Sequence, residues 1–219
     1  MKEQKVELVF ICDRSGSMSG LESDTIGGYN SMLCKQKALP GAVRVTTVLF
    51  DDRYELLHDR IDIQGVAPIT EREYYVRGCT ALLDAMGKTI QKIAAVQKVT
   101  APEQRADQVL FVIITDGMEN ASREYGAEQV RQLVERQKQQ FGWEFLFLGA
   151  NIDAIQTAGR FGIGADRAVN YHADAQGTRI NYEAVSQTIS HVRAGCPIAP
   201  TWKESIEADF KKRKRGDRR

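Results

Sequence analysis

Long apolar runs are absent from this chain of 219 residues. Its longest apolar stretches have the length of a strand, whereas a membrane-spanning helix needs about 18 or more such residues. The first residues, MKEQK, lead directly into an apolar run, without the charged-then-apolar pattern of a signal segment. We therefore expect no membrane partner and a cytoplasmic location.

Cysteine and histidine are few and scattered. The four cysteines are widely spaced and form no C-x-x-C pair, so we expect reduced thiols. We expect Cys12 and Cys79 to be small buried residues. The three histidines are His58, His172 and His191. Because they lie far apart in the sequence, we expect surface or packing roles for them rather than metal ligation.

Signatures of common enzyme classes are also missing. The chain contains no G-x-x-x-x-G-K-[ST] phosphate loop and no G-x-S-x-G nucleophile turn around Ser15 or Ser17. The segment LGAN at 148–151 follows a strand-like run but lacks a dinucleotide-binding fingerprint.

What is present is the composition of an ordinary globular protein, with 42% hydrophobic and 27% charged residues. The net charge of +1 is unevenly distributed. Residues 211–219 hold seven of the 30 basic and one of the 29 acidic residues, which leaves 23 basic against 28 acidic residues, or −5, elsewhere. Such a basic tail can contact nucleic acid, in which case binding is salt-dependent and lost on its deletion. We expect a solvated helix end instead.

Apolar patterns alternate between strand-like and helix-like segments along the chain. Because strands that alternate with helices favour right-handed crossovers, they predict an α/β fold. This fold is a doubly wound, mostly parallel sheet with helices on both faces. The short turn at 51–53 predicts a hairpin and hence one antiparallel edge strand. Strands are expected at 6–12, 43–50, 54–62, 109–115, 143–148 and 168–171, and helices at 21–39, from 82 onward, 126–141, 152–161, 182–192 and 202–213.

Two prolines, Pro197 and Pro200, indicate a linker near the C-terminus. We therefore divide the chain into a main domain, residues 1–195, and a C-terminal helix with the basic tail, residues 196–219.

Three loops carry short side chains that end in oxygen. Asp13, Ser15 and Ser17 follow the first apolar strand, and Asp116 follows the strand at 109–115. Thr80 precedes the helix that starts at 82. Loops after parallel strands converge at one sheet edge, where ligands bind. Oxygen ligands of this kind suit a hard cation such as Mg2+.

The segments DRSGS at 13–17, GCT at 78–80 and TDG at 115–117 together resemble the metal-ion-dependent adhesion site (MIDAS) of the von Willebrand factor A (VWA) domain family. The resemblance covers roughly the first three-quarters of the chain. It departs from the family at Cys79, where glycine often precedes the threonine; we expect metal binding to remain intact.

The resemblance implies a ligand set and a function. In the family, residues matching Asp13, Ser15 and Ser17 hold the ion, and those matching Thr80 and Asp116 contact it directly or through water. The expected ion is Mg2+, with Mn2+ or Ca2+ as alternatives. Neutral hydroxyls leave the ion under-neutralised, so an open coordination position attracts an Asp or Glu of a partner protein.

Other interpretations of the same residues remain open. Ser15 and Thr80 can act as ordinary helix caps, and Asp116 can begin a common turn. Asp13 can be the nucleophile of a Mg2+-dependent phosphatase or hydrolase, but the general acid expected two residues later is replaced by serine. We therefore predict a protein-binding module rather than an enzyme, with no catalytic residues. Glu119 and Asn120 are expected at the partner-binding rim.

Overall fold

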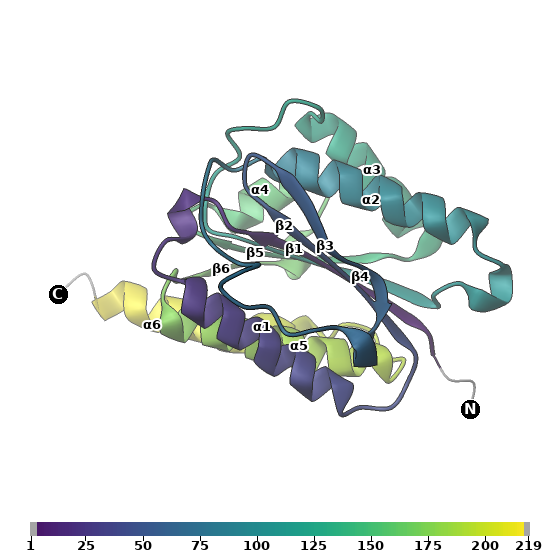
Figure 1. The fold of residues 1–219 in the computed structure, drawn as a ribbon. Coiled ribbons are helices and arrows are strands. Elements are labelled where there is room, and N and C mark those ends of the chain that lie inside the picture. Colours follow the sequence, from purple (N-terminus) through teal and green to yellow (C-terminus); the bar gives the residue numbers. More distant parts are fainter. Residues whose placement is uncertain (1–3, 217–219) are drawn as a thin grey trace.

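Six strands lie side by side at the centre of the molecule (Figure 1). The computed structural model describes residues 4–216. The strands are β1 (Val6–Asp13), β2 (Val43–Phe50), β3 (Tyr54–Asp62), β4 (Gln108–Thr115), β5 (Glu144–Ala150) and β6 (Ala168–Tyr171). Their order across the sheet is β3-β2-β1-β4-β5-β6, and every neighbouring pair is parallel except β2 and β3. The predicted sheet with one antiparallel edge strand is confirmed.

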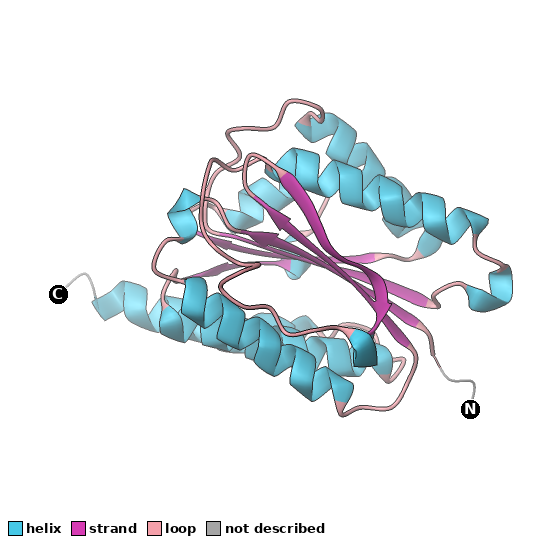
Figure 2. Cartoon of the chain, viewed as in Figure 1, coloured by secondary structure: helices cyan, strands magenta, loops and turns pink. Residues whose placement is uncertain are grey.

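Helices cover both faces of this sheet, as predicted (Figure 2). One face carries α1 (Glu22–Lys37), α5 (Ala175–Arg193) and α6 (Glu204–Gly216). The other carries α2 (Leu82–Val99), α3 (Ala127–Phe141) and α4 (Ala154–Arg160). Short 3-10 helices are η1 (Gly16–Met18), η2 (Ile63–Gly65), η3 (Pro102–Gln104), η4 (Ala165–Arg167) and η5 (Pro200–Lys203). No helix within residues 4–216 combines the length and apolarity needed to cross a bilayer.

The two central strands have the apolar sequences that their position requires. Every residue of β1 is buried, as is every residue of β4 after Gln108. A strand covered on both faces needs such a continuous apolar run. Cys12 of β1 pairs with Ile114 of β4, so the carboxyl ends of the two strands lie next to each other. The loops that follow these strands therefore start side by side.

Alternation of side chains along each strand divides the core into two layers. From β1, Leu8 and Phe10 pack on the α1 and α5 side, whereas Val9 and Ile11 pack on the α2 and α3 side. The hairpin of β2 and β3 has the bounds expected from the sequence. Because Phe50 also pairs with the last residue of β1, the hairpin turn lies at the same sheet edge as the first loop.

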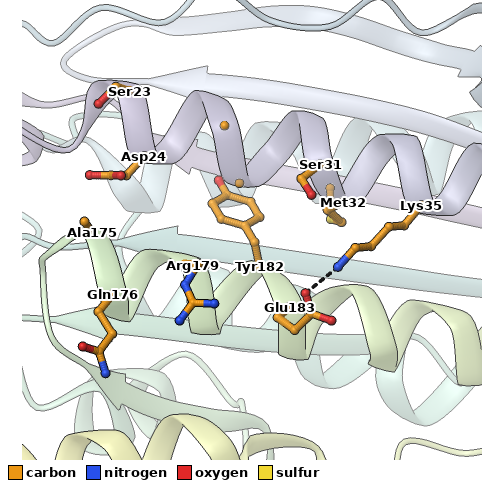
Figure 3. A pocket seen from close by; sticks show the side chains of 12 residues that line it. Ser23, Asp24, Ser31, Met32, Lys35, Ala175, Gln176, Arg179, Tyr182 and Glu183 are labelled. Carbon is orange, nitrogen blue, oxygen red and sulfur yellow. Dashed lines mark hydrogen bonds and ion pairs between the residues drawn. The ribbon is translucent and has the colours of Figure 1, made fainter.

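Helices α1 and α5 approach each other closely because α1 has a glycine at their contact. The Tyr182 ring lies against Gly28, where an added Cβ would be 2.3 Å from Tyr182 Cδ2. Beside this contact lies a groove of about 560 Å3 between the two helices (Figure 3). Lys35 and Glu183 form an ion pair across the groove at 2.5 Å.

The start of α5 differs from the prediction. The apolar pattern favours a start at Tyr182, but the helix begins at Ala175. Asp174 is its N-cap and accepts a hydrogen bond from Gly177 N at 2.8 Å. The first two turns are mostly polar and include a glycine, so they carry little apolar signal. The capping aspartate sets the start instead.

The C-terminal segment packs against the rest of the molecule. Helix α6 contacts β6 and α5, and Ile206 is buried in the same core layer as α5. Trp202 Nε1 donates a hydrogen bond to Asp166 O at 2.8 Å. The division of the chain between residues 195 and 196 stays a prediction. Residues 217–219, the end of the predicted basic tail, lie outside the described residues.

Candidate metal site

The three predicted loops come together at the carboxyl edge of the sheet. Ser15 and Ser17 lie 3.1 Å apart, measured between their hydroxyl oxygens. Thr80 Oγ1 donates a hydrogen bond to Ser15 Oγ at 3.0 Å, and Ser17 Oγ donates one to Asp116 Oδ1 at 2.5 Å. Four of the five predicted ligands thus form one chain of contacts, although they come from segments about a hundred residues apart.

Asp13, the fifth predicted ligand, is held at the end of β1. Its Oδ1 accepts a hydrogen bond from Ser15 N at 2.7 Å, and its Oδ2 accepts one from Thr115 Oγ1 at 2.6 Å. The sequence interpretation did not assign a role to Thr115. Its position at the end of a central strand, directly before Asp116, is the signal that would have identified it.

Burial makes the two carboxylates of this cluster electrostatically costly. Asp13 and Asp116 are each 1% exposed. Burial raises the pKa of Asp13 to about 6, against the opposing effect of its hydrogen bonds from Ser15 and Thr115. Burial also raises the pKa of Asp116. Asp116 Oδ2 is buried and has no hydrogen-bond partner among residues 4–216. A buried, unpaired carboxylate oxygen carries a large desolvation penalty, which a bound cation removes.

Helix capping does not explain the hydroxyl groups. The N-cap of α2 is Ala81, not Thr80, and the first-turn amides of Leu83 and Asp84 donate to Glu119 and Ser122 instead. Thr80 instead directs its hydroxyl at Ser15. Ser15 is the N-cap of η1, but its side chain makes no capping hydrogen bond. Neither side chain therefore makes a capping hydrogen bond, and both hydroxyls contact the cluster instead.

The donor set fits a hard divalent cation. Two carboxylates and three hydroxyls offer only oxygen atoms, which Mg2+, Mn2+ and Ca2+ accept. Within residues 4–216, no three His, Cys, Asp or Glu side chains come together as a metal site. Gly117 leaves space beside the cluster, because a Cβ there would lie 3.0 Å from Ser17 Oγ and 3.1 Å from Thr80 Oγ1. Ser17 is exposed, so the cluster is open to solvent on its side.

The two predicted rim residues hold the loop after β4 in place. Asn120 Oδ1 accepts a hydrogen bond from Thr80 N at 2.9 Å. The Glu119 carboxylate accepts hydrogen bonds from Leu83 N and Ser122 N, both at 2.8 Å. Their contact with a partner stays a prediction. Met118, which the sequence interpretation did not single out, is 73% exposed beside the cluster.

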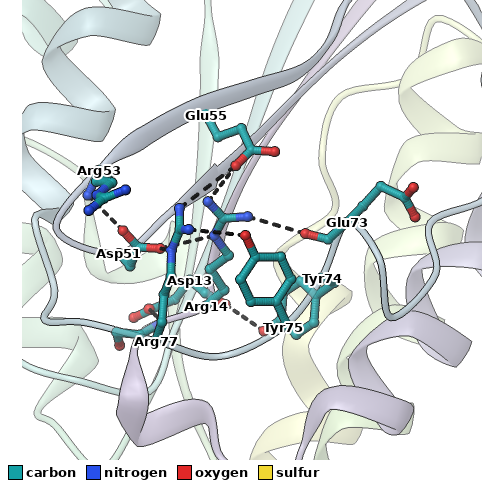
Figure 4. A network of polar contacts seen from close by, with 10 residues as sticks. Asp13, Arg14, Asp51, Arg53, Glu55, Glu73, Tyr74, Tyr75 and Arg77 are labelled. Carbon is teal, nitrogen blue, oxygen red and sulfur yellow. Dashed lines mark hydrogen bonds and ion pairs between the residues drawn. The ribbon is translucent and has the colours of Figure 1, made fainter.

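A buried arginine, Arg14, lies at the centre of a polar network next to Asp13 (Figure 4). Arg14 has a fully buried side chain and donates to Asp51 Oδ2 at 3.1 Å, Glu55 Oε2 at 2.6 Å and Glu73 O at 3.2 Å. Arg77 also donates to Asp51 Oδ2, at 2.6 Å. Burial alone would raise the pKa of Asp51, but its hydrogen bonds and the two arginine charges hold that pKa below its usual value.

This network joins the segment before Thr80 to the first loop. Arg77 N donates to the Arg14 carbonyl at 2.9 Å, and Gly16 N donates to Gly78 O at 3.1 Å. The Tyr74 hydroxyl donates to the Asp13 carbonyl at 2.5 Å. The sequence interpretation missed the network because its members are spread over more than sixty residues. The one available signal for the network was the charged residue Arg14 inside the motif DRSGS at 13–17.

The cysteines beside the cluster differ from each other. Cys12 is buried as expected, and burial raises its pKa to about 12. Cys79 is exposed, which contradicts the expectation of a buried residue. Its neighbour Gly78 has a φ of +65°, and this turn directs residue 79 outward. The histidines have packing or surface positions, as expected: His58 Nδ1 contacts Thr47 Oγ1 at 3.1 Å, the His172 ring packs against Phe210, and His191 is exposed.

Comparisons with known proteins show likeness at the level of structure. No family model matches the sequence, and no curated protein matches it. A mutant of the PilB minor pilin from Streptococcus sanguinis superposes with a TM-score of 0.64 at 12% identity. The match covers 92% of this chain and 63% of the pilin chain.

Two further structures have lower scores. Proximal thread matrix protein 1 from the mussel byssus, with zinc in its MIDAS motif, has a TM-score of 0.57 at 16% identity. A von Willebrand factor type A protein from Catenulispora acidiphila has a TM-score of 0.57 at 14% identity. The matches cover 84% and 85% of this chain but only 46% and 42% of those chains. From its sheet order, flanking helices and these likenesses, the chain has the VWA fold.

Proposed function

We propose that this chain is a metal-dependent protein-binding module whose cation, Mg2+ by preference, is held by Asp13, Ser15, Ser17, Thr80 and Asp116. One observation supports this proposal above others. Within the part of the chain that the structure describes, Asp116 Oδ2 is buried without a hydrogen-bond partner, next to hydroxyls that make no helix-capping hydrogen bond. The mussel protein, which shares the fold, has zinc in its MIDAS motif, and this supports cation binding at the cluster.

The residues of the site fix the carboxylate of Asp13 and limit the negative charge around the cation. Thr115 and the Ser15 amide fix both oxygens of Asp13. Three neutral hydroxyls add ligands without adding negative charge, so a divalent cation keeps excess positive charge. When bound, the cation supplies Lewis acidity that attracts a carboxylate. We infer that this carboxylate is an Asp or Glu side chain of a partner protein.

Metal binding is the first test. Isothermal titration with Mg2+ or Mn2+ should show binding in the millimolar range or tighter, and Asp13→Ala should abolish it. The matched control is Asp59→Asn, an exposed aspartate that pairs with Lys92 on the outer surface. Equal metal affinity in Asp13→Ala and the control, with both variants folded by circular dichroism, would place the metal elsewhere.

Partner capture is the second test. Binding of proteins from a lysate should be lost in EDTA and reduced by Thr80→Ala, since both remove part of the metal site. Capture that resists EDTA would point to a different surface.

A panel of phosphatase and phosphodiesterase substrates with Mg2+ tests the enzyme alternative. Turnover that disappears in Asp13→Asn would favour that alternative instead.

A further inference from the structure

A groove of about 520 Å3 lies beside the metal site. Cys79 and Ala81, the sequence neighbours of Thr80, line the groove. One wall is the β2–β3 turn, and another is the loop at 120–124. Small side chains such as Ala81 and Ala85 line the space between the walls. Its volume lies in the range of about 300–1,000 Å3 typical of ligand pockets.

The loop wall is preorganised by a carboxylate of α2. Asp84 accepts hydrogen bonds from the backbone amides of Arg123 at 2.9 Å, Glu124 at 2.9 Å and Tyr125 at 2.8 Å. Burial alone would raise the pKa of Asp84, but these three donors outweigh it and lower the pKa. Asp84 is therefore a satisfied anion. Because these hydrogen bonds already hold the loop at 120–124 in place, little conformational entropy of the loop would be lost when a ligand binds.

Two guanidinium groups of the groove remain unpaired. Arg53 on the turn and Arg123 on the loop are both exposed, and neither side chain has an ion-pair or hydrogen-bond partner within residues 4–216. The other cation of the groove, Lys88, is paired with Glu124 at 2.7 Å. Asp52 is turned toward Gly78, where an added Cβ would lie 2.1 Å from its Oδ1. The groove thus presents one free guanidinium on each wall.

We propose that the partner segment that offers a carboxylate to the metal carries a second acidic side chain, and that Arg53 and Arg123 bind this side chain in the groove. The proposal rests on the proposed function and adds the chemistry of the partner to it. Guanidinium groups match carboxylates through paired N–H donors. The partner is therefore an acidic peptide segment with two carboxylates at a fixed spacing, one for the metal and one for the arginines.

Selection of peptides tests this specificity. The full chain is immobilised in millimolar Mg2+, exposed to a phage library of random peptides, and eluted with EDTA. Eluted peptides should share two acidic positions at constant spacing. Replacing the second acid by alanine should weaken binding roughly tenfold, since exposed charge pairs contribute modestly. Replacing the first acid should abolish metal-dependent binding.

Charge reversal identifies the residues that read the second position. Peptides selected on the double variant Arg53→Glu with Arg123→Glu should keep the first acidic residue. Their second acidic position should change to Lys or Arg. The control is Arg136→Glu with Arg160→Glu, two exposed arginines on α3 and α4 outside the groove, which should select the original peptides. The neutral double variant, Arg53→Gln with Arg123→Gln, should select peptides that have no preferred residue type at the second position. Circular dichroism verifies that each variant is folded.

The outcomes separate this inference from the proposed function. EDTA-eluted peptides with one fixed acid and a random second position would overturn the groove inference and leave the metal-dependent module intact. The same holds if charge reversal leaves the second position acidic. Failure to recover any EDTA-eluted peptide, with metal binding verified by titration, would contradict the proposed function and the groove inference together.

Discussion

Asp13 is buried at a position where its charge has no cation among the described residues to balance it. That these five oxygen-bearing residues cluster was predictable from sequence, because each predicted ligand lies within a short motif at a strand or helix end. The contacts that position the cluster were not predictable. Thr115, Arg14 and Asp51 act through hydrogen bonds that depend on which segments meet in three dimensions.

The raised pKa of Asp13 makes the metal-free protein sensitive to pH. Folding raises this pKa from its usual value near 3.8 to about 6, so the folded state binds the proton more tightly. In EDTA, stability should therefore fall as pH rises from 4 to 6.5, with Asp13 contributing on the order of 3 kcal/mol. Saturating Mg2+ should reverse this loss, because it favours the ionised carboxylate.

Urea denaturation at several pH values, with EDTA and with Mg2+, measures this effect. Asp13→Asn cannot titrate at this position and serves as the control. Its stability in EDTA should fall less over the same pH range. Parallel pH profiles for the natural chain and Asp13→Asn would show that Asp13 is ionised without cost in the metal-free state.

Arg14 should be required for stability as well as for placing the loops. Arg14→Met removes the buried cation that pairs with Asp51 and leaves that carboxylate with one cation, Arg77, and the backbone amide of Arg53. Breaking a buried ion pair costs about 3–5 kcal/mol. The control, Arg136→Met on the exposed face of α3, should stay within about 0.5 kcal/mol. Urea denaturation compares them, and equal losses would show that the Arg14 network does not stabilise the fold.

Among the elements, those with strong apolar patterns were predicted well. The strands at 43–50 and 54–62 have the predicted bounds, because β-branched runs and a short polar turn leave few alternatives. Helix α5 begins seven residues earlier than expected, at Ala175 rather than Tyr182. A helix start set by one capping aspartate leaves no periodic apolar signal to detect.

Two adjacent glycines of α1 should respond oppositely to alanine. At Gly28 a Cβ would meet the Tyr182 ring at 2.3 Å, so Gly28→Ala should destabilise the protein by about 1–3 kcal/mol. At Gly27 a Cβ would have no heavy atom of the described residues within 4 Å, and a helix interior favours alanine over glycine by about 1 kcal/mol. Gly27→Ala should therefore stabilise. Thermal denaturation measures the midpoint of each variant relative to the natural chain. Midpoints that shift in the same direction would contradict this account of the α1–α5 contact.

Across the whole molecule, the C-terminal segment should unfold together with the sheet. Trp202 is 8% exposed against α5 and its neighbours, and Trp202→Ala should cost about 3–5 kcal/mol. Trp143 is then the single remaining tryptophan, on the opposite face of the sheet, stacked on Phe111. Its fluorescence should report a lower denaturation midpoint in Trp202→Ala. An unchanged Trp143 midpoint would instead support a separate appendage at 196–219.

The position of the cation is the most direct test of the whole account. A crystal of the protein soaked in manganese and measured at a wavelength with strong manganese anomalous scattering gives that position without assumptions about the ligands. We predict one anomalous peak enclosed by the oxygens of Asp13, Ser15, Ser17, Thr80 and Asp116. No peak among these oxygens, or a peak at another part of the surface, would contradict it.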